Sequence, residues 1–94
     1  MTNVCPKVWC TFFKAIHDEH RQLILDLLKK YGELNATEIV KKMKLSQPTV
    51  SHHLKILHQA ELIHAHKNGK EMMYSLNPEP IIKCCNGFKN RFAE

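Results

Sequence analysis

The sequence predicts a mostly α-helical domain that carries one β-hairpin, and two observations support this prediction. Up to residue 59, apolar residues recur every three to four positions, and residues typical of helix caps separate the runs. After Glu61 apolar and polar residues alternate on both sides of Asn68-Gly69, which is the pattern of two strands joined by a tight turn. We therefore expect five helices and a hairpin in the order α-α-α-α-β-β-α.

The first helix is expected at residues 8–16, VWCTFFKAI, and the second from Glu19 to the glycine at position 32. The first segment places several large apolar side chains on one side and is too apolar to stand alone, so it should pack on the last helix or on a second subunit. Asp18 is an N-cap candidate for the second helix, and Gly32 supplies its C-terminal stop.

The third and fourth helices are expected to be close neighbours joined by a tight turn. Asn35 with Glu38 resembles a capping box, and this short helix should end near Lys44. Ser46 can cap a fourth helix over residues 47–59, in which Pro48 is tolerated in the first turn. This spacing fits a helix-turn-helix, with the fourth helix as the recognition helix.

The alternating segment at residues 62–76 forms the hairpin, and residues 81–92 can form a last helix that Gly87 weakens. Asn68-Gly69 favours a type I′ turn, which needs a positive φ at both central residues. Helix, helix, helix-turn-helix, hairpin and helix is the order of a winged helix-turn-helix. The hairpin would be its wing, and residues 1–94 would form a single domain.

Composition narrows the choice of partner and compartment. Fourteen Lys and Arg against nine Asp and Glu give 94 residues a formal charge of +5, which favours a polyanionic partner or simply marks a basic protein. Hydrophobic residues make up 44% of the chain, but no apolar run approaches the ~20 residues of a membrane span, so we expect a cytoplasmic protein without a membrane partner. A domain this small gains a fuller core by forming a dimer.

The polar side of residues 47–59 suits the major groove of double-stranded DNA, where amides, hydroxyls and imidazoles can bond base edges. Lysines there and at the hairpin tip can position the protein on phosphates. The alternative is that these residues only cap or solvate an exposed helix. His53 lies nearer the apolar side and is interpreted as a hydrogen-bonded structural histidine. The predicted DNA contacts are Gln47, Thr49, Ser51, His52, Lys55, Lys67 and Lys70.

Three segments, DEHRQLILDLL, LSQPTVSHHLKILHQAELI and NGKEMMYSLNP, resemble successive signature regions of the ArsR/SmtB family of bacterial and archaeal repressors. The resemblance covers roughly Phe12 to Pro80 and implies a homodimer that binds an imperfect inverted repeat in a promoter. It also implies that the first and last helices, about 8–16 and 81–92, pair across the dimer. In that family a metal ion or another signal releases the DNA.

The effector sites familiar from that family are missing here. Asn35 and Thr37 stand where its thiolate site has cysteine and small residues, and the last helix contains no His, Asp or Glu ligands. Four cysteines remain as candidates for sensing: Cys5, Cys10, Cys84 and Cys85.

Thiolates prefer soft ions, so these cysteines could hold As(III), cadmium or zinc, or form a disulfide switch. Adjacent cysteines lie about 100° apart on a helix, unless a loosened turn at Gly87 lets both contribute. Alternatively, Cys10 and one of the pair are small core residues, and the repressor has no metal inducer. His64 with His66, and His17 with His20, are weaker metal candidates that a solvent-facing strand and a helix start explain more simply. No cofactor is expected to be needed for folding.

Two further classes of function were weighed. A winged-helix interaction module, which dimerises or binds a protein without reading DNA, is opposed by the charge and by the polar set on the fourth helix. An enzyme is not expected, because the sequence has no glycine-rich phosphate loop, nucleophile elbow or suitably spaced carboxylate pair.

Overall fold

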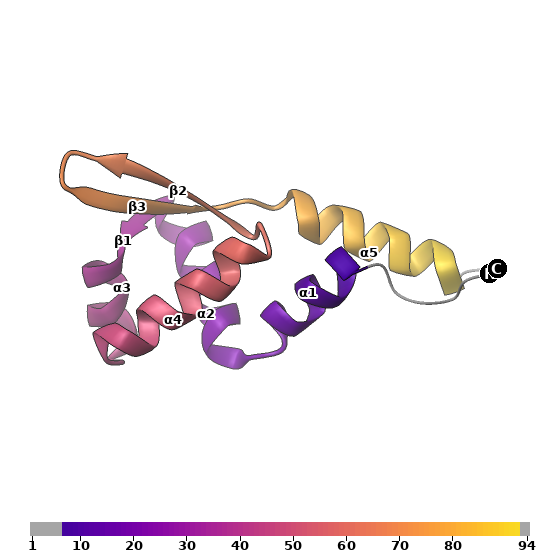
Figure 1. The fold of residues 1–94 in the computed structure, drawn as a ribbon, viewed down its shortest axis with the longest axis horizontal. Coiled ribbons are helices and arrows are strands. Elements are labelled where there is room, and N and C mark those ends of the chain that lie inside the picture. Colours follow the sequence, from indigo (N-terminus) through magenta and orange to yellow (C-terminus); the bar gives the residue numbers. More distant parts are fainter. Residues whose placement is uncertain (1–6, 93–94) are drawn as a thin grey trace.

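The computed structural model describes residues 7–92, and they form five helices with a small antiparallel sheet at one edge (Figure 1). The elements in chain order are α1 (Lys7–Ile16), α2 (Glu19–Tyr31), β1 (Glu33–Asn35), α3 (Ala36–Met43), α4 (Gln47–Gln59), β2 (Ile63–Asn68), β3 (Glu71–Leu76) and α5 (Glu79–Phe92). The predicted fold class, helical with a β-hairpin wing, is confirmed, and a short strand β1 is added to it.

Local capping chemistry explains where the helices begin. Asp18 accepts a hydrogen bond from the Arg21 backbone N–H at 3.0 Å and caps α2. Asn35 and Glu38 form the expected capping box at the start of α3, each side chain accepting from the other residue's backbone N–H. The Ser46 hydroxyl caps α4 by accepting from the Thr49 backbone N–H. In all three helices a side-chain oxygen thus satisfies a backbone donor that has no partner within the helix.

The sheet contains a strand that the sequence did not predict. Its order is β1-β3-β2, and every pairing is antiparallel, so β1 lies beside β3 and the wing is joined to the helical body. Asn35 continues this connection, because its side-chain amide donates a hydrogen bond to Glu71 at 2.6 Å. The segment that starts α3 therefore holds β3 along most of its length, from Ser75 to Glu71 beside the hairpin turn.

The turn of the hairpin corrects the expected type I′ turn at Asn68-Gly69. Asn68 pairs with Glu71, so the two loop residues are Gly69 and Lys70. A positive φ occurs at Gly69 (69°), and Asn68 and Lys70 are not among the positive-φ residues. A positive φ at the first loop residue only is the pattern of a type II′ turn, which needs glycine there.

The core lies where α2, α3 and α4 meet the base of the sheet. Its fully buried side chains come from every part of the helical body, the largest being Phe12, Ile24, Leu28, Ile39, Leu57, Leu62 and Val50. Helix α5 runs beside α1 and extends away from the wing (Figure 1), and it begins at Glu79, two residues before the expected start at Ile81. Within residues 7–92, no helix is long and apolar enough to cross a membrane.

Candidate nucleic-acid interface

Helix α4 turns one side into the core and leaves the other side exposed. Val50, Leu54 and Leu57 are buried on the inner side, at the three-to-four spacing that the sequence shows. The predicted contacts on this helix are all exposed: Gln47, Thr49, Ser51, His52 and Lys55. The core therefore fixes which side of α4 meets a partner.

The start of α4 is held by a hydroxyl pair. The Ser46 hydroxyl accepts from the Thr49 backbone N–H at 3.3 Å, and the two hydroxyl oxygens lie 2.7 Å apart in a hydrogen bond of their own. Thr49 thus takes part in the cap, as one alternative interpretation held, while its side chain stays exposed. A hydroxyl has one donor and two acceptor positions, so capping does not use up its capacity to bond a partner.

The wing lies next to the exposed side of α4. A surface hollow separates the two elements, and its lining includes Ser51, Lys55 and His58 from α4 with Ala65, Met72 and Tyr74 from the strands. Lys67 near the end of β2 and Lys70 in the turn are exposed at the wing tip. Lysines are therefore present on both sides of the hollow, where they can approach one polyanion.

His53 points inward from the same helix, as predicted for a hydrogen-bonded structural histidine. Its exposed fraction is 7%, and its Nδ1 accepts a hydrogen bond from the Arg21 guanidinium at 3.3 Å. Burial lowers the pKa of His53, and the positive charge of Arg21 lowers it further, against the opposing effect of Asp18. His53 therefore favours the neutral form that can accept this bond.

The three cysteines that the structure describes differ in their surroundings. Cys5 lies outside the described residues, Cys10 is half-buried on α1, and Cys84 is buried on α5 while Cys85 is exposed. Helix α5 continues through Gly87, so the adjacent cysteines point in different directions. Burial raises the pKa of the Cys84 thiol, and the neighbouring Cys85 raises it further. Among the described side chains, no group of three ligands includes a cysteine.

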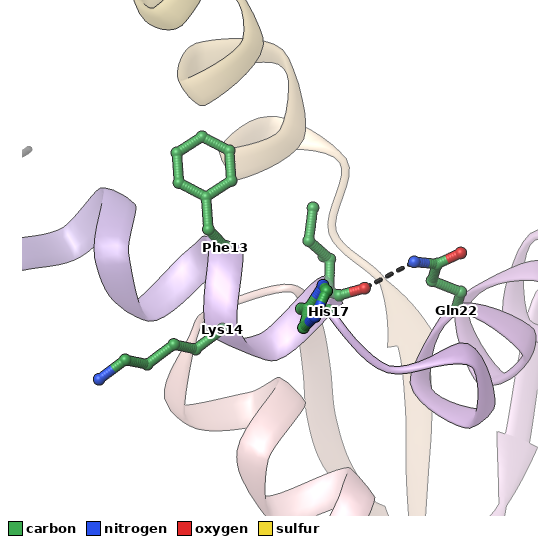
Figure 2. A pocket seen from close by; sticks show the side chains of 5 residues that line it. Phe13, Lys14, His17 and Gln22 are labelled. Carbon is green, nitrogen blue, oxygen red and sulfur yellow. Dashed lines mark hydrogen bonds between the residues drawn. The ribbon is translucent and has the colours of Figure 1, made fainter.

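The histidine pairs proposed from the sequence have different surroundings in the structure. His64 and His66 are both exposed on β2, and His66 lies 3.4 Å from the carboxylate of Glu33 on β1, across β3. His17 lines a surface hollow at the corner between α1 and α2, where the Gln22 amide donates to the Ile16 carbonyl at 2.6 Å (Figure 2). His20 instead lies near His53 and Asp18, a grouping that the sequence did not indicate because its members come from two separate helices.

Comparison with known proteins identifies the family. The model of the family described as "Bacterial regulatory protein, arsR family" matches residues 18–65, which include α2, α3, α4 and the start of β2. The transcriptional repressor SdpR of Bacillus subtilis (strain 168) is 51% identical over 78 residues, covering 83% of this chain and 86% of the relative. The chain belongs to the arsR family. This ArsR protein is a DNA-binding transcriptional regulator, as the resemblance implied, and several of its relatives are named as repressors.

Two further matches, one in sequence and one in structure, agree with this family. An arsenical resistance operon repressor of Staphylococcus xylosus is 46% identical over 69 residues, covering 73% of this chain and 65% of the relative. An ArsR-like transcriptional regulator from Rhodococcus sp. RHA1 has a TM-score of 0.81 at 23% identity, covering 88% of this chain and 77% of that one. This ArsR protein therefore shares its fold with that solved structure.

Proposed function

We propose that this ArsR protein is a dimeric repressor that places α4 of each subunit in successive major grooves of a promoter inverted repeat. Gln47, Ser51 and His52 would bond base edges, with Thr49 beside them at the helix start. Lys55 on α4, with Lys67 and Lys70 at the wing tip, would bind phosphates. The proposed site of action is the cytoplasm, where promoter DNA lies.

The orientation of α4 is the observation that carries this proposal. Its apolar side is buried in the core, so the helix cannot rotate to hide the polar side. That exposed side carries amide, hydroxyl and imidazole groups, which are the groups that read base edges. The net charge of +5 favours approach to a phosphate backbone.

Replacing Gln47 or Ser51 by alanine tests whether α4 reads sequence. Each replacement should weaken binding to DNA taken from upstream of the protein's own gene by about 1 to 3 kcal/mol, and weaken binding to random DNA much less. Fluorescence anisotropy on both duplexes at the same salt concentration measures the difference. Gln59→Ala is the matched control, because Gln59 is also an exposed polar residue of α4 but lies at its far end.

Equal losses on both duplexes would mean that these side chains touch phosphates and not bases. Absence of duplex binding at moderate salt, together with retained affinity for a protein partner, would favour a winged-helix interaction module without DNA recognition. The two measurements thus distinguish base reading, phosphate contact and protein interaction as the role of α4.

We further propose that the cysteines respond to a thiophilic signal, either a soft metal ion or a thiol oxidant. Relatives of this chain are named for arsenical and cadmium resistance, and Cys10 and Cys84 lie on α1 and α5, which pack together. Arsenite, cadmium, zinc and a thiol oxidant should release the protein from DNA. If replacement of all four cysteines leaves every response intact, the thiol proposal fails, and a repressor without a metal inducer remains.

A further inference from the structure

The structure brings together three ligand-type side chains on the inner side of the recognition helix. Asp18 caps α2, His20 follows in the first turn of that helix, and His53 reaches them from the middle of α4. One ligand atom from each residue lies within 4.8 Å of the other two, and the two imidazole ring centres are 5.8 Å apart. No other group of three such residues occurs among the side chains that the structure describes.

Two of the three groups are already held in position. The Asp18 carboxylate accepts the capping bond from the Arg21 backbone N–H at 3.0 Å, which fixes its direction. His53 is 7% exposed and enclosed by the core. His20 is half-buried, so its ring is less confined than that of His53. A site in which two ligands are fixed and one adjusts loses little conformational freedom on binding an ion.

We propose that Asp18, His20 and His53 form a binding site for a divalent transition-metal ion of the zinc type. Two imidazole nitrogens and one carboxylate oxygen suit Zn²⁺ and its neighbours Co²⁺, Ni²⁺ and Cu²⁺, unlike the thiolate sets that soft ions prefer. Three protein ligands leave a fourth tetrahedral position for water. Zinc–nitrogen and zinc–oxygen distances of about 2.1 Å place tetrahedral ligand atoms about 3.4 Å apart, which a rotation of the His20 ring can approach.

Binding of the ion requires Arg21 to release His53, whichever ring nitrogen becomes the ligand. A neutral imidazole has one N–H and one free lone pair, and at present Nδ1 accepts from the Arg21 guanidinium. An ion at Nδ1 would replace Arg21 directly. An ion at Nε2 would require the proton to lie on Nδ1, which could then no longer accept. In either case an ion bridge between α2 and α4 replaces the bond from Arg21.

The released Arg21 has other partners that keep it nearby. Its Nε donates to the Ala15 carbonyl at 2.6 Å, and another of its nitrogens donates to the Lys14 carbonyl at 3.1 Å. Its positive charge therefore stays close to the ion and weakens binding, while the Asp18 carboxylate opposes this effect. The site should accordingly bind zinc reversibly and not as a permanent structural ion.

Zinc binding is tested on the full-length chain without DNA. A second form carries Cys5→Ser, Cys10→Ser, Cys84→Ala and Cys85→Ser, so that zinc cannot bind thiolates; alanine suits the buried position of Cys84. Competition with a chromophoric chelator gives the stoichiometry and affinity, and the visible absorption of Co²⁺ reports the coordination geometry. We expect one ion per chain in the cysteine-free form, with tetrahedral Co²⁺ absorption.

The ligand variants are made in that cysteine-free background. His20→Gln and Asp18→Asn should each weaken zinc binding by at least about tenfold, and asparagine retains the N-cap acceptor so that α2 stays intact. His17→Gln is the matched control, because His17 is an exposed histidine three positions before His20 and should leave the affinity unchanged. The nitrogen resonances of the His53 ring should move when zinc is added.

Unchanged zinc affinity in both ligand variants, or no saturable binding to the cysteine-free form, would overturn the proposed site. If His20→Gln fails to fold, Asp18→Asn decides the result alone. An effect of zinc on operator binding would rest on the proposed function, because the ion bridges the recognition helix to α2. Since zinc affinity is measured without DNA, failure of the metal site and failure of DNA recognition are distinguished.

Discussion

Arg21 connects three helices through one partly buried guanidinium. It donates to the carbonyls of Lys14 and Ala15 in the last turn of α1, to His53 on α4, and lies 3.9 Å from the Asp18 carboxylate on its own side of α2. A positive charge near the carbonyls at a helix C-terminus is favourable, because these groups carry the negative end of the helix dipole. This one side chain therefore fixes the end of α1 relative to the recognition helix.

Replacing Arg21 by methionine should destabilise the protein by about 2 to 4 kcal/mol. Methionine keeps most of the apolar stem but leaves two carbonyls and His53 without their charged donor, and hydrogen bonds to charged groups contribute about 1.5 to 3 kcal/mol each. Urea denaturation followed by circular dichroism measures the loss. Lys29→Met serves as the control, since Lys29 is exposed on the same helix and should change stability by less than about 0.5 kcal/mol.

His53 should make the folded protein sensitive to mild acid. Burial lowers its pKa below the ordinary value of 6.5, so the unfolded chain binds a proton there more readily than the folded one. The folded state therefore keeps its full free energy of unfolding above pH 6.5. That free energy falls as the pH drops from 6.5 toward the lowered pKa of His53. Denaturation of metal-free protein across this range should show a steeper loss for the wild type than for His53→Gln; equal slopes would contradict the assignment.

Helix α4 ends in a defined C-terminal motif that contains a strained residue. The Leu62 N–H donates to the Leu57 carbonyl and the Glu61 N–H to the His58 carbonyl, both at 3.0 Å, which is the bond pattern of a Schellman motif. Glu61 has a φ of 60°, in the left-handed region where glycine is preferred. The recognition helix thus ends with a residue poorly suited to its own turn.

Glu61→Gly should therefore stabilise the protein by about 0.5 to 1 kcal/mol. Glycine removes the steric cost of the left-handed conformation, which exceeds the cost of its greater freedom in the unfolded chain. The midpoint of urea denaturation should rise, whereas Glu61→Ala, which retains a Cβ atom, should not raise it. A gain of the same size in the alanine variant would attribute the effect to the lost carboxylate and not to the backbone.

The elements that the sequence predicted well are those specified by neighbouring residues. Asp18, Ser46 and the Asn35–Glu38 pair cap their helices through contacts three residues away, so local sequence contains the information. Strand β1 was missed because it has three residues and exists through its pairing with β3, far along the chain. The grouping of His20 with His53 was missed for the same reason, since only the packing of α2 against α4 brings them together.

The molecule is elongated, with extents of 47 × 22 × 20 Å. Part of this length comes from α5, which extends beyond the helical body beside α1 (Figure 1). Ile82 on α5 is 57% exposed, although isoleucine is among the residues most often buried in proteins. An exposed apolar side chain on a projecting helix agrees with the proposed dimer, in which α1 and α5 of two subunits pair.

Ile82→Asp should separate the dimer and weaken operator binding together. A carboxylate cannot be buried unpaired against an apolar partner, whereas the monomer already leaves position 82 in water. Analytical ultracentrifugation should show monomers, and operator affinity should fall by about 10²-fold or more because two linked half-sites become independent. Asn90→Asp adds the same charge to α5 at another exposed position and should change neither property. If Ile82→Asp stays dimeric, the interface lies away from Ile82. If it becomes a monomer that keeps full operator affinity, one α4 is sufficient for recognition.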